Sequence, residues 1–512
     1  MTPINSTDWA GIDPRDQDAY DRLQAKLVPL WASLDHLNKD EQTIVVVPSA
    51  DLDVGLTASH MQAYEERFLF MLFLLRQPRA RVVFVTGQKI SDEIVDYFLD
   101  LLPGVIESHA RKRLFFISPM EARWGSLSRK VLDRPHLVAE IRELIPDRDR
   151  AHLVPFMTTW DDRELAMRLG IPMYGADPAH MVYGTKTSGR RIFAEAGVEH
   201  PPGREDLKTR AEVAEAIVAL AGDHPTADRV IVKLNEGVSG FGNVTVDLSS
   251  LGAVTVETVD TALSEVAIDA AIGDVDTYFE HLQREGAVVE LLVSGGIVRS
   301  PSVQLRITPL GEVELLSTHD QILGGDSGQV FLGSRFPADP SYAGQISESA
   351  ARVGDVLAAR GVIGRFALDF VVVERSDGEW DVFAIEINLR KGGTTHPFLT
   401  LQFLTDGAYD PDRAVFVAPD GAQKHYVASD HLTIDGLQVF RPQDLLDLAL
   451  LHELHFDQTR HTGVVFHMLS AMPTHGFVGV TCIENTAEEA EALYERTVEF
   501  LTEQARLHQS PW

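Results

Sequence analysis

The sequence predicts a mixed fold, in which an α/β layer is followed by α+β parts. Near the start of the chain, runs rich in β-branched residues alternate with amphipathic stretches, the pattern of a parallel sheet. Later apolar runs follow one another closely, as they do in an antiparallel sheet. The length of 512 residues exceeds what one hydrophobic core usually organises. We therefore expect two or three packed subdomains.

The first subdomain is expected to span residues 1–178 and to hold the parallel sheet. Its predicted strands lie at 43–47, 81–86 and 114–118, with amphipathic stretches at 61–75 and 91–102 between them and a helix at 161–169 after them. The β-branched composition of the strands is typical of strands buried on both faces.

The second subdomain, 179–400, is expected to have two parts: a small α+β lobe at about 184–295 and an antiparallel sheet at about 296–400. In the lobe we expect helices at 186–196, 211–221 and 275–284, and strands at 229–234 and 243–247. In the sheet we expect strands at 302–308, 312–317, 366–373 and 381–387.

The last piece, 401–512, is predicted to be a C-terminal α+β cap. It contains a helical stretch at 442–456, an apolar run at 462–469 and a strand-like run at 477–483. Thr486-Ala-Glu-Glu489 has the spacing of a capping box and predicts the start of a long final helix.

Composition limits the classes of partner. The net charge of −31 would repel nucleic acid and anionic membrane surfaces, so we expect neither as a partner. The longest apolar run, Phe68 to Leu75, is far shorter than the roughly 18 to 20 residues that a membrane-spanning helix needs. With 45% hydrophobic and 24% charged residues, the chain has the composition of an ordinary folded protein.

The cellular compartment is predicted from two features. The N-terminus is rich in aspartate and lacks the basic and then apolar segments of a secretion signal. Cys482 is the only cysteine, so no disulfide can form within the chain. Both features favour the cytoplasm.

A lysine and a glycine-rich loop form the first candidate for chemistry. Lys233 lies near the end of a predicted strand, and the loop 235–243 that follows contains three glycines. Glycines let backbone N–H groups approach phosphate oxygens, and a lysine supplies a positive charge to the same anion. The spacing matches neither the Walker pattern nor GxGxxG. A glycine-rich hairpin turn with a solvent-reaching lysine remains the alternative.

Two acidic strands form the second candidate. Asp369 and Glu386 lie in apolar runs that should be buried, where an unpaired carboxylate is costly. Strand alternation puts Glu386, Asn388 and Arg390 on one face. Carboxylate and amide oxygens suit Mg²⁺ held between protein and phosphates. A buried salt bridge with Arg365 or Arg390 is the alternative explanation.

These segments, taken in order, resemble the ATP-grasp superfamily of carboxylate–amine ligases. The matching elements are Thr185-Lys186 with the segment 190–198 and Pro201-Pro202-Gly203, then Lys233 to Gly242, then the hinge-like Val288 to Val293, and then Asp369 with Glu386-Ile387-Asn388-Leu389-Arg390. They span residues 185–396, about two fifths of the chain. More narrowly, the tail Gly392-Gly393-Thr394-Thr395-His396-Pro397 is similar to actinobacterial peptide ligases of the pheganomycin type.

The resemblance implies an architecture and a set of roles. The first subdomain would be a Rossmann-like pre-ATP-grasp domain, and the second a two-lobed ATP-grasp domain. The implied cofactors are ATP and Mg²⁺. The residues implied to contact ATP are Lys186, Lys233, Ser239, Gly240, Glu290 and Leu292 through its backbone, and those implied to hold magnesium are Asp369, Glu386 and Asn388.

Three arginines near these segments have different expected roles. The resemblance implies that Arg390 faces the carboxylate or acyl phosphate, so that Arg390 and Lys233 would be catalytic. Arg306, on the strand after the hinge, is a candidate for phosphate or substrate-carboxylate binding, with a surface arginine as the alternative. Arg190 departs from many relatives, which have another small or basic residue there.

The predicted function is ATP-dependent amide or peptide bond formation through an acyl phosphate, with release of ADP and phosphate. The expected partners are ATP, a carboxylate substrate such as an amino acid, and an amine or peptide acceptor. The candidate assembly is a homodimer. The alternatives are an ATP-grasp kinase, a ligase for a non-peptide acceptor, and a nucleotide-binding regulatory protein.

Two further segments have competing interpretations. His452-Glu453-Leu454-His455 with His461 invites a metal interpretation, but it is not HExxH, and structural histidines are the better account. The segment 320–329 combines glycines with amides, as a mobile substrate loop would, and a plain long hairpin is the alternative.

Overall fold

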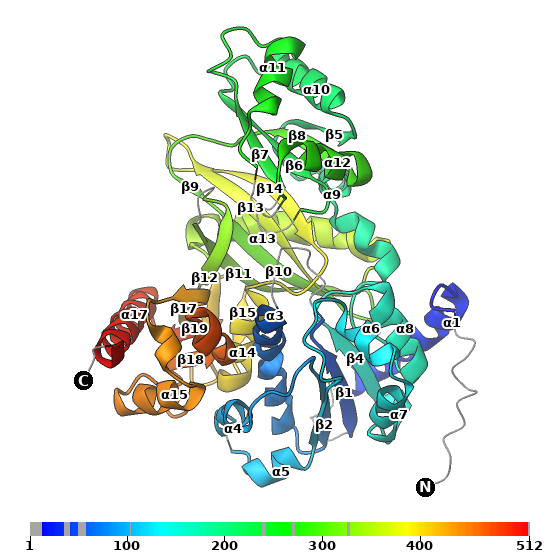
Figure 1. Cartoon of the computed structure of the whole chain (residues 1–512), viewed down its shortest axis with the longest axis vertical. Helices are drawn as coiled ribbons and strands as arrows, with labels where there is room; N and C mark the ends of the chain where they lie inside the picture. Colours follow the sequence, from blue (N-terminus) through cyan, green and yellow to red (C-terminus); the bar gives the residue numbers. More distant parts are fainter. Residues whose placement is uncertain are drawn as a thin grey trace.

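The computed structural model describes residues 13–34, 41–49, 58–102, 104–237, 242–268, 272–324 and 328–509. Within them the strands form a four-stranded parallel sheet, a second four-stranded sheet, a nine-stranded sheet and a two-stranded ribbon. Figure 1 shows the second four-stranded sheet in an upper lobe, standing on a broad base that contains the parallel sheet and the C-terminal helix α17 (Ala487–Gln509). The predicted α/β and α+β fold is confirmed.

The first sheet has the strand order β3-β2-β1-β4 and is parallel throughout. Its strands are β1 (Gln42–Val47), β2 (Ala80–Val85), β3 (Leu114–Ile117) and β4 (Ala151–Pro155). The α-helices around it are α1 (Gln17–Gln24), α2 (Leu27–Leu34), α3 (Ala58–Glu66), α4 (Asp92–Asp100), α5 (Glu107–Arg111), α6 (Leu127–Leu132), α7 (Pro135–Glu143) and α8 (Trp160–Leu169). Three 3-10 helices accompany them: η2 (Arg67–Arg76), η3 (Arg148–Arg150) and η4 (Pro178–Gly184).

The stretch expected to be one amphipathic helix at 61–75 is divided in two. The α-helix α3 ends at Glu66, and the 3-10 helix η2 continues from Arg67. Most of η2 is buried, including the whole run Phe68 to Phe73. Because this run has no polar face, it cannot lie at a surface as an amphipathic helix would.

The upper lobe is built on an antiparallel sheet with the order β5-β8-β6-β7. Its strands are β5 (Gly203–Leu207), β6 (Arg229–Leu234), β7 (Asn243–Asp247) and β8 (Ala287–Leu291). Its helices are α9 (Lys186–Glu195), α10 (Arg210–Asp223), α11 (Val256–Ser264) and α12 (Val275–Glu285). The strands expected at 229–234 and 243–247 are confirmed with the same bounds.

The nine-stranded sheet links the lobe to the C-terminal part of the chain. Its main path is β14-β13-β10-β11-β12-β17-β19-β18, and β9 pairs with β13 beside it. The strands from the middle of the chain are β9 (Val298–Arg299), β10 (Pro301–Ile307), β11 (Val313–Gly324), β12 (Val330–Phe336), β13 (Gly364–Glu374) and β14 (Trp380–Asn388), with α13 (Pro340–Ala359) packed on the sheet. The segment around 320–329 is thus mostly the hairpin of β11 and β12, with residues 325–327 outside the described part.

The C-terminal strands continue this sheet, because β12 pairs with β17. The strands of this part are β15 (Ala408–Asp410), β16 (Val415–Val417), β17 (His425–Thr433), β18 (Gly463–His467) and β19 (Phe477–Glu484). Its helices are α14 (Thr395–Thr405), η5 (Leu437–Val439), α15 (Pro442–Leu451), η6 (Leu469–Ala471), α16 (Met472–His475) and α17 (Ala487–Gln509). Thr486 Oγ1 accepts a hydrogen bond from the Glu489 N–H at 3.1 Å, which agrees with the expected cap.

One hydrophobic core joins distant parts of the sequence. Side chains of β2 and η2 pack in the same cluster as side chains of α14, β17, β19 and α17. For example, the rings of Phe73 and Phe403 lie 6.4 Å apart. The division of the chain at residues 178 and 400 stays a prediction, and this core crosses both positions.

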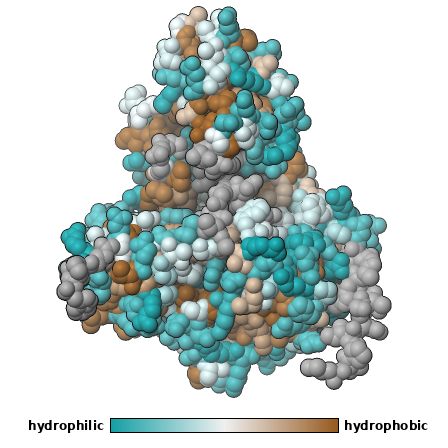
Figure 2. Space-filling view, in the orientation of Figure 1, coloured by the Kyte–Doolittle hydropathy of each residue, from teal (hydrophilic) through white to brown (hydrophobic). Residues whose placement is uncertain are grey.

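The outer surface agrees with a strongly charged composition. Figure 2 shows hydrophilic side chains over most of the visible face, with hydrophobic ones in smaller separate areas. None of the described helices is both long enough and apolar enough to cross a membrane.

The junction between β12 and β17 generates a stability prediction. A Cβ atom at Gly333 would collide with the carbonyl oxygen of Ala428 on the neighbouring strand. We expect Gly333→Ala to destabilise the fold by about 1–3 kcal/mol, because the backbone of β17 would have to shift. The measurement is the thermal unfolding midpoint of the purified protein.

The matched control is Gly344→Ala in the exposed interior of α13, where a Cβ meets nothing within 4 Å. Alanine is favoured over glycine there by about 0.5–1 kcal/mol, so this midpoint should stay or rise. Equal midpoints for the two variants would contradict the close packing of β12 on β17.

Candidate active site

A buried ion network organises the base of the upper lobe. Lys233, on β6, places Nζ 2.6 Å from Oε2 of Glu290 on β8. Arg190, on α9, places Nη1 2.8 Å from the other carboxylate oxygen. The side chains of Lys233, Glu290 and Arg190 are only 11%, 2% and 4% exposed. Burial by itself would raise the pKa of Glu290. The positive charges of Lys233 and Arg190 have the larger effect, so the pKa of Glu290 is lowered.

Arg190 also ties neighbouring segments to this network. Its Nε lies 2.5 Å from Oε1 of Glu205, and its Nη1 donates to the carbonyl of Pro201 at 2.7 Å. The sequence indicated no partner for Arg190, which differs from the residue that many relatives have there. The signal that could have identified one is a buried arginine in a helix, which needs acceptors.

Lys186 connects the lobe to the nine-stranded sheet. It is the first residue of α9, and Thr185 caps this helix by accepting from the Ser188 N–H. The Nζ atom of Lys186 donates to the carbonyl of Gly237 at 3.0 Å and forms an ion pair with Glu386 on β14. The start of the glycine-rich loop and an acidic strand thus meet at one ammonium group. Ser239 and Gly240 of the loop lie outside the described residues.

The two acidic strands bring their carboxylates together. Asp369 on β13 lies directly opposite Glu386 on β14, so their side chains share one face. Asn388 Nδ2 donates to Asp369 Oδ2 at 3.0 Å, and Ser302 on β10 lies on the other side of Asp369. Burial and the negative charge of Glu386 raise the pKa of Asp369. This arrangement concentrates negative charge and oxygen ligands at one place.

Positive charges around Glu386 oppose that concentration. Burial would raise the pKa of Glu386, but Lys186, Arg390 and Lys233 together hold it below its usual value. Arg390 follows β14, and burial lowers its pKa while Glu386 and Asp369 act in the opposite direction. Both lysines therefore act on the same carboxylate, although 47 residues separate them in the sequence.

One predicted site residue, Arg306, is engaged elsewhere. Arg306 Nε lies 2.5 Å from Oε2 of Glu314, and its guanidinium lies over the Trp31 ring. It is four positions along β10 from Ser302, which at about 3.3 Å per residue is roughly 13 Å. The structure does not bring Arg306 to the group around Glu386. The backbone N–H of Leu292 donates to the carbonyl of Arg229 at 3.1 Å, at the end of β8.

The assembled side chains define the class of site. Two lysines of the small antiparallel lobe act on Glu386, which faces a second carboxylate, Asp369, on the larger sheet. Cations next to paired carboxylates suit the binding of an anion together with a divalent metal ion.

Comparisons with known proteins identify this class. A family model described as "IQCH-like, ATP-grasp" matches residues 178–268 and 273–412, and a model of the PGM1 C-terminal domain matches 444–497. The chain is 31% identical over 445 residues to the L-propargylglycine–L-glutamate ligase of Streptantibioticus cattleyicolor, covering 85% of this chain and 88% of that protein. The chain therefore belongs to the ATP-grasp family and is a ligase of that family, as predicted. The kinase and regulatory alternatives are not favoured.

More distant relatives agree on the fold. IQ motif-containing protein H of Danio rerio is 25% identical over 403 residues, which are 69% of this chain and 38% of that protein. The solved biotin carboxylase of Campylobacter jejuni aligns with a TM-score of 0.53 at 13% identity, over 91% of this chain and 95% of that chain. The biotin carboxylase domain of the Hydrogenobacter thermophilus 2-oxoglutarate carboxylase gives 0.52 at 12% identity, over 91% and 94%.

The Glu290 network generates a second stability prediction. Glu290→Gln would leave Lys233 and Arg190 buried without their shared carboxylate. We expect a loss of about 3–5 kcal/mol in stability, because an uncompensated buried charge is costly. The thermal unfolding midpoint checks this.

Glu205→Gln is the matched control, because Glu205 pairs with the same Arg190 but is 29% exposed. We expect a much smaller decrease for it. If both variants melt at the same temperature, Glu290 is not the anion on which the network depends.

Proposed function

We propose that the enzyme joins the carboxylate of an amino acid to the amine of a second amino acid or peptide, with ATP as the energy source. The observation that carries the proposal is the facing pair Asp369 and Glu386, with Lys186 and Arg390 beside it. The name of the Streptantibioticus relative, which joins two amino acids, supports the substrate class.

In this proposal Asp369, Glu386 and Asn388 hold Mg²⁺. The donor set fits a hard divalent cation, because the carboxylates of Asp369 and Glu386 share one face of β13 and β14, and the side-chain amide of Asn388 contacts Asp369. The raised pKa of Asp369 supports the fit, since a second charge next to Glu386 is unfavourable until a cation compensates it. When bound, Mg²⁺ supplies charge neutralisation at the phosphates.

Lys186 and Lys233 are proposed to bind the ATP phosphates, together with Ser239 and Gly240 of the glycine-rich loop. Glu290 and the Leu292 backbone are proposed to meet the nucleoside. The Glu290 carboxylate would also keep Lys233 in place, as its short ion pair indicates. These residues position the nucleotide and stabilise the charge that develops on the transferred phosphoryl group.

The proposed chemistry has two steps. An oxygen of the substrate carboxylate attacks the γ-phosphorus, the bond to the β-phosphate oxygen breaks, and ADP leaves while an acyl phosphate forms. The amine nitrogen then attacks the acyl carbon, the carbon–oxygen bond to phosphate breaks, and inorganic phosphate leaves. Arg390, whose charge acts on both Glu386 and Asp369, is proposed to orient the carboxylate and then the acyl phosphate.

The segment after residue 400 is proposed to select the amine. Helix α14 begins five residues after Arg390, and β17 continues the sheet that carries the acidic strands. A long acceptor could thus contact this segment while its amine lies at the acyl phosphate. We further propose that the enzyme acts in the cytoplasm and assembles as a homodimer.

The direct test is product analysis with the purified full chain, ATP and Mg²⁺, and a panel of amino acids offered as acid and as amine. We expect ADP and phosphate only when both an acid and an amine are present, together with a condensed product in the mass spectrum. A phosphorylated acceptor without condensation would overturn the proposal.

The metal assignment predicts the effect of Glu386→Gln. Losing one carboxylate of the pair should lower kcat by at least about 100-fold, the scale seen when a group that stabilises transition-state charge is removed. Turnover at saturating Mg²⁺ and the thermal midpoint are measured together. Glu379→Gln, on the exposed turn before β14, is the control and should keep its activity. Full activity of the Glu386 variant at limiting Mg²⁺ would refute the assignment.

The phosphate assignment predicts a contrast between two lysines of the lobe. Lys233→Ala removes a buried charge from the proposed ATP site, whereas Lys208→Ala removes an exposed one. A hydrogen bond to a charged group contributes about 1.5–3 kcal/mol, so kcat/KM for ATP should fall by about 10- to 100-fold in the Lys233 variant. The Lys208 variant should match the parent, and similar kinetics for both variants would exclude Lys233 from ATP binding.

A further inference from the structure

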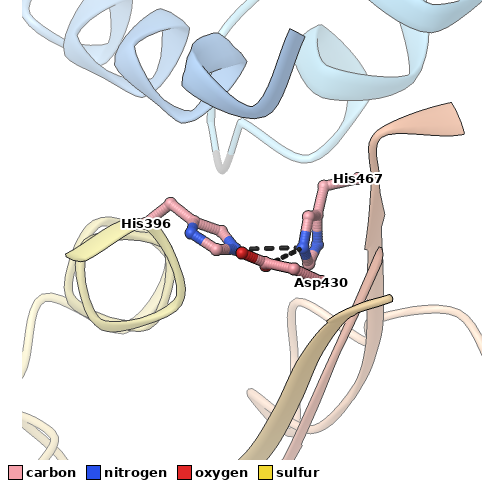
Figure 3. Close-up of side chains that lie close together, drawn as sticks. All are labelled: His396, Asp430 and His467. Carbon is pink, nitrogen blue, oxygen red and sulfur yellow. Dashed lines mark hydrogen bonds and ion pairs between the residues drawn. The ribbon is translucent and has the colours of Figure 1, made fainter. Parts of the chain in front are cut away.

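Two histidines and an aspartate from three separate elements meet in the base of the molecule. They are His396 on α14, Asp430 on β17 and His467 at the end of β18 (Figure 3). Their side chains are 5%, 6% and 4% exposed. Among the described residues this is the one group of histidine, cysteine and acidic side chains with a geometry that could hold a metal ion.

The three polar atoms form a nearly equilateral triangle. His396 Nε2 and His467 Nε2 lie 3.0 Å apart, and they lie 3.1 Å and 3.0 Å from the same oxygen, Oδ1 of Asp430. In Figure 3 both imidazole rings point their Nε2 atoms at this carboxylate oxygen. Such a triangle has three edges, and each edge needs a hydrogen or a shared cation.

Hydrogen bonding does not satisfy all three edges. A carboxylate oxygen has no proton, and each Nε2 carries at most one. If both protons are directed to Asp430 Oδ1, the two Nε2–H groups face each other. If one proton is missing, one nitrogen presents its lone pair to another acceptor. One cation over the centre of the triangle would satisfy all three atoms.

The dimensions suit a zinc ion. Zinc binds imidazole nitrogen at about 2.0–2.1 Å and carboxylate oxygen at about 2.0–2.2 Å, usually in a tetrahedron. Tetrahedral ligands at these distances lie about 3.3 Å from one another. The observed separations of 3.0–3.1 Å need only a small expansion. Two imidazoles with one carboxylate are also a ligand set that zinc accepts in proteins.

The surrounding chain keeps this geometry in place. Gly479 lies opposite His467 in the pairing of β18 with β19, and a Cβ atom there would collide with the imidazole. Arg67 of η2 places Nη1 2.5 Å from Oδ2 of Asp430, which directs Oδ1 to the histidines. The second carboxylate oxygen is thus occupied, and the first is available for an ion.

We propose that His396 Nε2, Asp430 Oδ1 and His467 Nε2 bind a zinc ion. This site is separate from the proposed Mg²⁺ site, and its ligands come from the C-terminal part of the chain. The ion would fasten α14, which follows the catalytic strand β14, to β17 and β18. The ion would stabilise this junction, because a metal ion that binds three segments at once keeps them from separating.

The test is the zinc content of the untagged full chain, purified and dialysed in excess Mg²⁺ so that zinc cannot remain at the proposed magnesium site. We expect about one zinc per chain, and a lower thermal midpoint after treatment with a zinc chelator, restored by adding zinc. Asp430→Asn and His467→Gln should each lower the zinc content several-fold. Glu386→Gln and His319→Gln should retain it, the latter because His319 is a buried histidine bonded to Gln304 and Ser317.

A second measurement needs no variant and so does not depend on their folding. The metal-free wild-type protein, titrated with Co²⁺ in excess Mg²⁺, should develop the visible absorption of a tetrahedral cobalt site, and zinc should remove it. Folded wild-type protein with no bound zinc and no cobalt spectrum would overturn the proposal and leave a hydrogen-bonded cluster. Zinc retention in Asp430→Asn equal to that of the parent would also overturn it. A catalytically inactive protein that still binds zinc would refute the proposed function and leave this site standing.

Discussion

Two carboxylates held face to face inside the protein are the constraint on which the site depends. Asp369 and Glu386 occupy paired positions on β13 and β14, and both side chains are half-buried. Two negative charges on paired strand positions are tolerated only if cations or hydrogen-bond donors surround them. Asn388 donates to Asp369, Lys186 pairs with Glu386, and Arg390 lies in the field of both. The hairpin therefore specifies which charges other segments must bring to it.

This requirement orders the upper lobe against the sheet. Lys186 reaches Glu386 across 200 residues of sequence and also binds the carbonyl of Gly237. The helix α9 that starts at Lys186 carries Arg190, which shares Glu290 with Lys233. Lys186, Arg190 and Lys233 are thus each held by a carboxylate or a carbonyl before any ligand binds. A site with its dipoles already oriented loses little energy to rearrangement during a reaction.

Elements and site residues that a local sequence pattern marks could be predicted. Contacts between residues far apart in the sequence could not. Strands β6 and β7 were predictable because both are short runs rich in β-branched residues on either side of a glycine-rich loop. Asp369, Glu386 and Asn388 were predictable because one hairpin holds all three. Glu290, the buried carboxylate that pairs with Arg190, is 100 residues away from it, and His396, Asp430 and His467 come from three elements. No local spacing therefore marks these contacts. The run in η2 was expected to be amphipathic, but its burial is decided by segments from the far end of the chain.

The same long-range packing determines where the hairpin of β13 and β14 ends. After Arg390 the backbone N–H of Lys391 donates to the carbonyl of Phe156, and its ammonium donates to the carbonyl of Pro155 at the end of β4. Helix α14 then buries its apolar side chains with those of η2, β17 and β19. The hairpin that carries the acidic residues is therefore anchored at its exit by the parallel sheet and by the C-terminal strands together. Because the parallel sheet and the C-terminal strands both contribute to this anchor, the position of Arg390 relative to Glu386 depends on the folding of the whole base. The hairpin by itself does not fix it.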